Sequence, residues 1–130
     1  MNRSFLLLLL LNLSLLVPCR AEEPAFDQTK LVGEWRYENE PEKQVAQYVF
    51  RADGTFAAEL FQGGESVRKF TGRWKIEEGM ILYTYEKDSL GKVGAGARER
   101  DRLIRLDESS YTIEGGDRGQ RSYWRVKESK

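Results

Sequence analysis

The sequence predicts an all-β domain in which eight antiparallel strands follow one another as hairpins and close into an up-and-down barrel. Apolar and polar residues alternate with a period of two along most of the chain after Leu31, which is the pattern of half-buried strands. Short segments rich in Gly and Asp separate these runs, as hairpin turns do. No long amphipathic helix interrupts them. Closure is expected because an open meander would leave two unpaired edges and one bare apolar face.

The chain begins with a segment typical of export. The apolar run Phe5–Val17 ends at Pro18 and is shorter than the roughly 20 residues of a membrane span. The small residues Cys19 and Ala21 stand third and first before a cut after Ala21. A cleavable signal-peptide helix is therefore expected over 1–21. The alternative is a bacterial lipoprotein that is cut before Cys19 and lipidated on it. Soluble export is favoured because Pro18 stands where a lipoprotein signal carries Gly, Ala or Ser, and we expect a secreted or periplasmic protein.

The exported body divides into an N-terminal tail over 22–30 and a barrel domain over 31–130. In the tail, Asp27 or Thr29 predicts the cap of one short helical turn. The expected strands, in chain order, cover residues 31–38, 45–51, 55–61, 70–76, 80–85, 100–106, 110–113 and 120–127.

Glycine inside two of these strands indicates how the sheet closes. Gly33 and Gly72 each stand two residues before a tryptophan expected in the core. A glycine there permits a tight bend or the close approach of another backbone. The pattern leaves open which side chains of 80–85 and 120–127 face inward.

Composition excludes several classes of function. The 21 Lys and Arg residues balance 21 Asp and Glu residues, which gives no large positive field for nucleic acid. Histidine is absent and Cys19 is the sole cysteine, so the body has no His-containing triad, His or Cys zinc site, disulfide or thiol nucleophile. We expect no catalytic residue, no metal, no cofactor and no enzyme activity. We expect a monomer, with membrane contact only through a lipidated Cys19.

Two charged or glycine-rich segments have competing interpretations. The longest expected loop contains Gly91, Gly94 and Gly96, but a phosphate cradle needs a helix after it, and a strand pattern follows. A lid over the barrel mouth or a plain flexible loop are the remaining interpretations.

The next segment carries a cluster of arginines that either meets an anionic group or forms a solvated strand face. Interleaved acids favour the solvated face; the arginines are Arg98, Arg100, Arg102 and Arg105.

Two segments resemble a known family. Lys30–Trp35 contains a Gly-x-Trp sequence that resembles the motif at the start of lipocalins. Tyr48–Phe56, followed by Gly72-Arg73-Trp74, is similar to small bacterial lipocalin-like (calycin-type) secreted domains. The resemblance covers roughly residues 31–127. It implies an up-and-down barrel that binds small apolar molecules or protein partners.

The resemblance also implies an arginine that packs across the first tryptophan. Arg125, or else Arg121, matches this role over Trp35 as a cation–π contact worth about 0.5–2 kcal/mol.

The predicted interior is rich in aromatic rings. One interpretation is a stacking pocket for a flat or lipid-like molecule at one open end of the barrel; the other is that the rings simply fill the barrel. The candidate ligand-binding residues are Trp35, Tyr48, Phe56, Ala58, Phe70, Trp74, Tyr111 and Arg125. The expected function is an exported binding module for a small hydrophobic molecule or an exported protein. The alternatives are a peptidase inhibitor that uses the tail Glu22–Phe26 and an envelope structural protein without a ligand.

Overall fold

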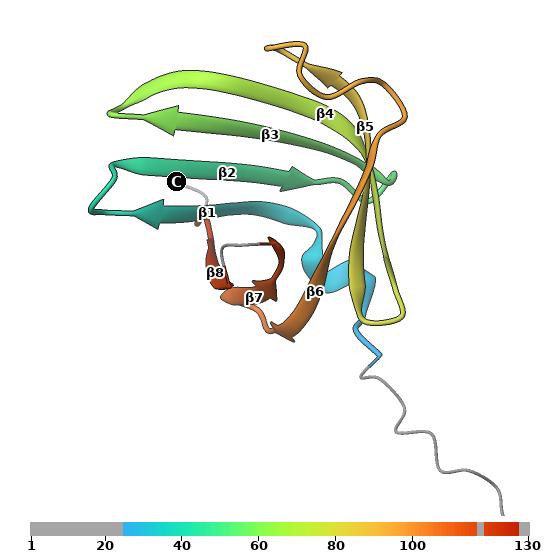
Figure 1. The fold of residues 1–130 in the computed structure, drawn as a ribbon. Coiled ribbons are helices and arrows are strands. Elements are labelled where there is room, and N and C mark those ends of the chain that lie inside the picture. The colour runs from blue at the N-terminus through green and yellow to red at the C-terminus, as the bar shows by residue number, and fades with distance from the viewer. Residues whose placement is uncertain (1–24, 117–118, 128–130) are drawn as a thin grey trace, which may run out of the picture.

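The strands form a closed barrel in a computed structural model that describes residues 25–116 and 119–127. Each strand pairs antiparallel with the next, and β1 pairs with β8. This confirms the expected up-and-down barrel. The predicted signal peptide lies outside the described residues. The elements are η1 (Gln28–Leu31), β1 (Gly33–Asn39), β2 (Gln44–Phe50), β3 (Thr55–Gln62), β4 (Glu65–Glu77), β5 (Met80–Asp88), β6 (Arg98–Leu106), β7 (Ser110–Glu114) and β8 (Gln120–Arg125) (Figure 1).

The largest difference from the expected bounds is in β4, which begins at Glu65 instead of residue 70. The turn before it contains only Gly63 and Gly64, with φ of 58° and 85°. Two consecutive residues with positive φ make a tight hairpin whose twist matches the flanking strands. The strands can therefore pair up to the turn, as Gln62 does with Glu65.

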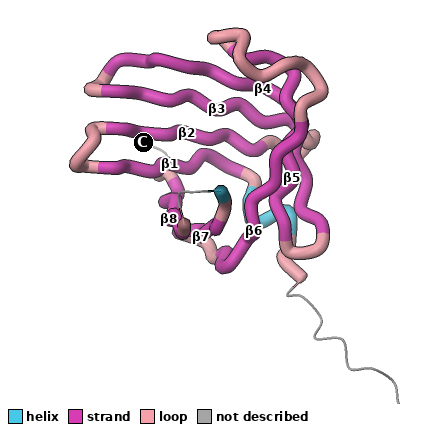
Figure 2. Tube along the Cα trace, viewed as in Figure 1, coloured by secondary structure: helices cyan, strands magenta, loops and turns pink. Residues whose placement is uncertain are grey.

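The short helix η1 closes one end of the barrel (Figure 2). The Asp27 side chain accepts a hydrogen bond from the Thr29 amide at 3.0 Å, which confirms the predicted cap. Leu31, the last residue of η1, is fully buried, and its carbonyl accepts from Nε1 of Trp35 at 2.9 Å. The Gln28 side chain accepts from the amide of Ile76 at 2.9 Å. We call this the closed end.

Aromatic rings fill the barrel next to the closed end. Trp35 meets Tyr111 edge-on with ring centroids 4.9 Å apart, and Phe50 meets Trp74 at 5.0 Å. Such edge-to-face pairs add stability beyond the area that they bury. The largest fully buried side chains are Trp35, Tyr111, Phe50, Phe56, Leu31, Ile81 and Ile113.

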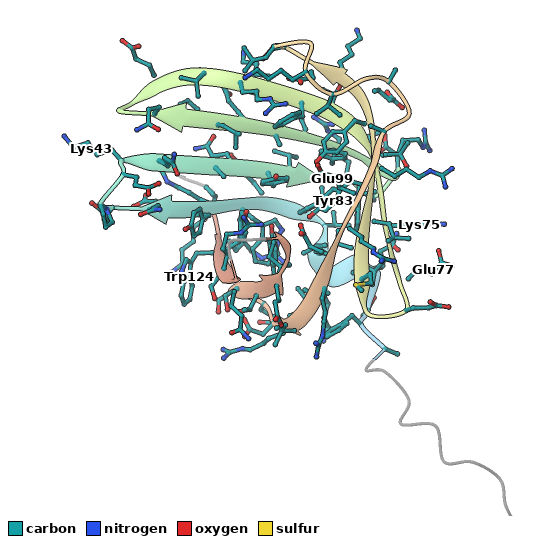
Figure 3. The ribbon with its side chains drawn as sticks, viewed as in Figure 1. Lys43, Lys75, Glu77, Tyr83, Glu99 and Trp124 are labelled. Carbon is teal, nitrogen blue, oxygen red and sulfur yellow. The ribbon has the colours of Figure 1, made fainter. Side chains whose placement is uncertain are left out.

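The structure shows which side chains of β5 and β8 face the interior of the barrel, a question that the sequence left open. In β5, Ile81, Tyr83 and Tyr85 are buried, so Leu82 faces outward. In β8, Tyr123 is buried and Trp124 is 60% exposed; Figure 3 shows Trp124 directed away from the barrel.

Candidate functional site

The end of the barrel opposite η1 is hollow. It is framed by the β1–β2 and β3–β4 turns and by the β5–β6 and β7–β8 loops, and we call it the mouth. Two cavities of about 170 Å³ and 480 Å³ lie there and share Tyr48, Leu60 and Arg121 as lining residues. The larger volume is within the range of small-molecule sites, about 300–1,000 Å³. Other lining residues include Tyr37, Ala46, Arg68, Phe70, Tyr83, Tyr85, Val93, Glu99, Asp101 and Tyr123.

One wall of the mouth is apolar and aromatic. The Tyr123 ring lies 5.4 Å from that of Tyr37 and 5.6 Å from that of Tyr48, centroid to centroid. Leu60 packs beside these rings. β1 continues to Asn39, whereas its Cα register with β8 is given by Trp35–Arg125 and Arg36–Trp124, so Tyr37 and Tyr123 line the smaller cavity beyond the paired part of the two strands. The three tyrosines and Leu60 offer a surface for an apolar body.

The opposite wall is polar because β6 turns acids inward. Leu103 is buried, so the alternation of β6 places Asp101 and Glu99 on the same inner face. The Tyr85 hydroxyl donates to Oε2 of Glu99 at 2.8 Å. Figure 3 shows Glu99 and Tyr83 close to each other beside the crossing of β5 and β6. The four arginines of the predicted cluster are exposed, as the sequence favoured; they are Arg98, Arg100, Arg102 and Arg105.

Arg121 and Asp101 lie together in the mouth. The Nε of Arg121 is the one buried side-chain nitrogen or oxygen without a hydrogen-bond partner in the described part of the chain. Burial raises the pKa of the Asp101 carboxyl, and the Arg121 charge and the Tyr83 hydroxyl oppose that rise. The half-buried Asp101 carboxyl and the Arg121 guanidinium therefore line the same cavity within electrostatic range of each other, and Nε of Arg121 has no acceptor among the described residues.

The tyrosine hydroxyls of the mouth remain protonated. Burial raises the pKa of Tyr48 and of Tyr83 well above the usual tyrosine value. Both hydroxyls are therefore neutral groups that can donate and accept hydrogen bonds.

The glycine-rich loop at the mouth is organised by Asp88. This carboxylate is fully enclosed and accepts two bonds from Arg68, at 3.0 and 2.7 Å. It also accepts from the amides of Leu90, Lys92 and Val93, at 2.9–3.0 Å. These bonds hold the pKa of Asp88 far below the usual aspartate range. The loop is followed by β6 and not by a helix, and through Val93 it forms part of the mouth.

Replacing Asp88 with alanine should release this loop. The change removes an acceptor from three loop amides and from Arg68, and segments that lose such bonds open more often. Tryptic cleavage after Lys92, followed by mass spectrometry, should become several-fold faster. Asp53→Ala is the matched control, because Asp53 accepts from the Thr55 amide in a turn at the closed end; it should leave cleavage after Lys92 unchanged. Equal cleavage rates in Asp88→Ala and the unaltered protein would contradict the assignment.

The predicted site residues separate into two groups. Tyr48 and Phe70 line the mouth. The others lie away from it in the packed core or at the closed end, and they are Trp35, Phe56, Ala58, Trp74, Tyr111 and Arg125. Ala58 is buried beneath the mouth without lining either mouth cavity. Arg125 lies over Trp35 with its guanidinium carbon 4.2 Å from the ring centroid, which confirms the expected cation–π contact.

Sequence reasoning missed the charged residues of the mouth, namely Arg68, Asp88, Glu99 and Asp101, and it considered Arg121 only as a partner for Trp35. The period-two alternation along β6 and β8 indicates that several of these residues face inward. Counting back by two from the apolar Leu103 reaches Asp101 and Glu99, and counting back from Tyr123 reaches Arg121. Polar residues at inward positions near a strand end were read as solvated.

Within residues 25–116 and 119–127, no group of three or more His, Cys, Asp or Glu residues is placed to hold a metal ion. No helix in the described part of the chain has the length and hydropathy needed to cross a membrane.

Comparison with solved structures identifies the fold. A lipocalin-like protein from Bacteroides uniformis aligns with a TM-score of 0.50 and 19% identity over 74% of this chain and 97% of its own. The chain has a lipocalin-like fold. This lipocalin-like barrel also aligns with an uncharacterised protein from Bacteroides eggerthii, with a TM-score of 0.49 and 16% identity over 73% of this chain and 98% of that one. No protein-family model matches the sequence, and no curated protein matches it.

Proposed function

We propose that this chain is an exported binding module that holds a small, largely apolar molecule in the mouth of its barrel. The observation that carries the proposal is the contrast between the two ends. The closed end is plugged by η1 and by packed rings, whereas the mouth keeps a cavity of about 480 Å³. Export rests on the predicted signal peptide over 1–21, and binding rather than catalysis rests on the composition.

The shape of the mouth supports a small molecule as the ligand. The rings of Tyr37, Tyr48 and Tyr123 present their faces and edges to the smaller cavity. Apolar walls with few convergent polar groups are typical of small-molecule sites. An apolar molecule that displaces water from this wall gains the free energy of burying its surface and the ring surface together.

Filling the mouth should weaken binding. Leu60→Trp adds a large side chain to the wall that both mouth cavities share, because Leu60 lines both of them. The neutral fluorescent probe N-phenyl-1-naphthylamine should bind the unaltered protein with increased emission. Leu60→Trp should weaken that binding by about tenfold or more, since an overpacked site costs 1–3 kcal/mol.

Thr71→Trp is the control, because Thr71 is exposed on β4 and the same ring there leaves the mouth open. It should bind the probe as the unaltered protein does. Absence of any emission change with the unaltered protein, or equal binding by both tryptophan variants, would contradict a ligand in the mouth.

A further inference from the structure

The guanidinium of Arg121 has one buried nitrogen that no described residue satisfies. Its Nε is buried without a partner, and no described residue accepts a hydrogen bond from it or forms an ion pair with it at contact distance. By contrast, Arg68 has two bonds to Asp88. A buried side-chain N–H seldom stays without an acceptor inside a protein. Because Arg121 lines both mouth cavities, a molecule in the mouth can supply the missing acceptor.

The charges around Arg121 restrict the chemistry of that molecule. Arg68 is paired with Asp88, and Glu99 accepts from Tyr85. Arg121 acts electrostatically on Asp101. Arg100 also lines the larger cavity, so among the described residues three arginines stand against three acids and the local charges balance. An anionic group placed against Arg121 would also face the carboxylates of Asp101 and Glu99, and a cationic group would face Arg121 itself. Either charge would be partly desolvated beside described groups of its own sign.

We propose that the ligand of the mouth is a neutral amphipathic molecule whose polar end accepts a hydrogen bond from Arg121 and donates one to Asp101. A primary amide is the simplest group that does both. The apolar body lies against Tyr37, Tyr48 and Tyr123, on the wall opposite to the acids. The proposal rests on the proposed function and adds the chemical class of the ligand.

The test compares four probes that share one flat ring system and differ only in the polar end. These are 2-naphthamide, 2-naphthoate, 2-naphthylmethylammonium and 2-methylnaphthalene, each titrated in competition with N-phenyl-1-naphthylamine. The unaltered protein should bind the amide about tenfold tighter than each of the other three, the difference that a good buried polar contact makes. This comparison needs no variant and does not depend on how a substitution folds.

Arg121→Met then tests the residue. It should bring amide binding down to the level of 2-methylnaphthalene while leaving 2-methylnaphthalene binding unchanged. Arg102→Met is the matched control, because the Arg102 side chain is 68% exposed on the outer face of β6, and it should keep the preference for the amide.

The outcomes separate the two proposals. Tightest binding of the carboxylate or the ammonium, or equal binding of amide and methylnaphthalene, overturns the neutral donor–acceptor end and leaves the binding function standing. An amide preference that persists in Arg121→Met overturns the role of Arg121. If no probe, including N-phenyl-1-naphthylamine, binds at all, the proposed function and this inference fall together.

Discussion

Gly72→Ala should destabilise the barrel by about 3 kcal/mol or more, a loss reserved for severe overpacking or backbone strain. A Cβ at this position would meet the carbonyl oxygen of Thr84 and the ring of Phe56. The carbonyl belongs to β5, which pairs with β4 through Arg73 and Thr84 and through Gly72 and Tyr85. Relief of the clash therefore requires the two strands to separate at the register shift between Thr71 and Gly72. Glycine at this position is what lets the two strands approach so closely.

The measurement is urea unfolding followed by tryptophan fluorescence, where the midpoint should fall with an unchanged slope. Gly94→Ala is the matched control, because a Cβ at Gly94 meets nothing within 4 Å and its midpoint should change little. A Gly72→Ala protein that unfolds at the same urea concentration as Gly94→Ala would show that β4 and β5 can adjust to a side chain there.

Arg125→Lys should destabilise the barrel by about 2–4 kcal/mol, although it keeps the charge. The guanidinium donates to the carbonyls of Val32 at 2.9 Å, Lys30 at 2.8 Å and Glu108 at 2.7 Å. It also lies over the Trp35 ring. One planar group thus ties β8 to the chain around η1 and to the β6–β7 turn, and an ammonium group cannot reach three diverging carbonyls while stacked on a ring.

Thermal and urea unfolding measure this loss. Arg105→Lys serves as the control, because the Arg105 side chain is 68% exposed and hydrogen-bonds only to Asp107. We expect Arg105→Lys to unfold within about 0.5 kcal/mol of the unaltered protein. Wild-type stability of Arg125→Lys would mean that η1 and the packed rings close that end without the arginine.

Local rules were sufficient for the strands and their turns. Alternation placed Trp74 and Phe70 on one face of β4. The helix cap at Asp27 and the close approach of neighbouring atoms at Gly33 and Gly72 were predicted from the positions of these residues in the sequence. Each of these features depends on residues close in sequence or on a single steric requirement. The start of β4 was missed, because alternation weakens near Val67, which is 46% exposed close to the β3–β4 turn.

The amino-acid sequence by itself therefore determined an eight-stranded barrel with an aromatic interior, and the resemblance to lipocalins implied the arginine over Trp35. Only the tertiary structure decided which end is hollow and that Asp101 and Arg121 line one cavity there. Alternation assigns side chains to two faces of a strand, but a face bearing both Leu103 and Asp101 has no obvious direction until the sheet closes. Closure brings β6 and β8, almost twenty residues apart in sequence, around one shared space, and that distance is beyond the reach of any local pattern.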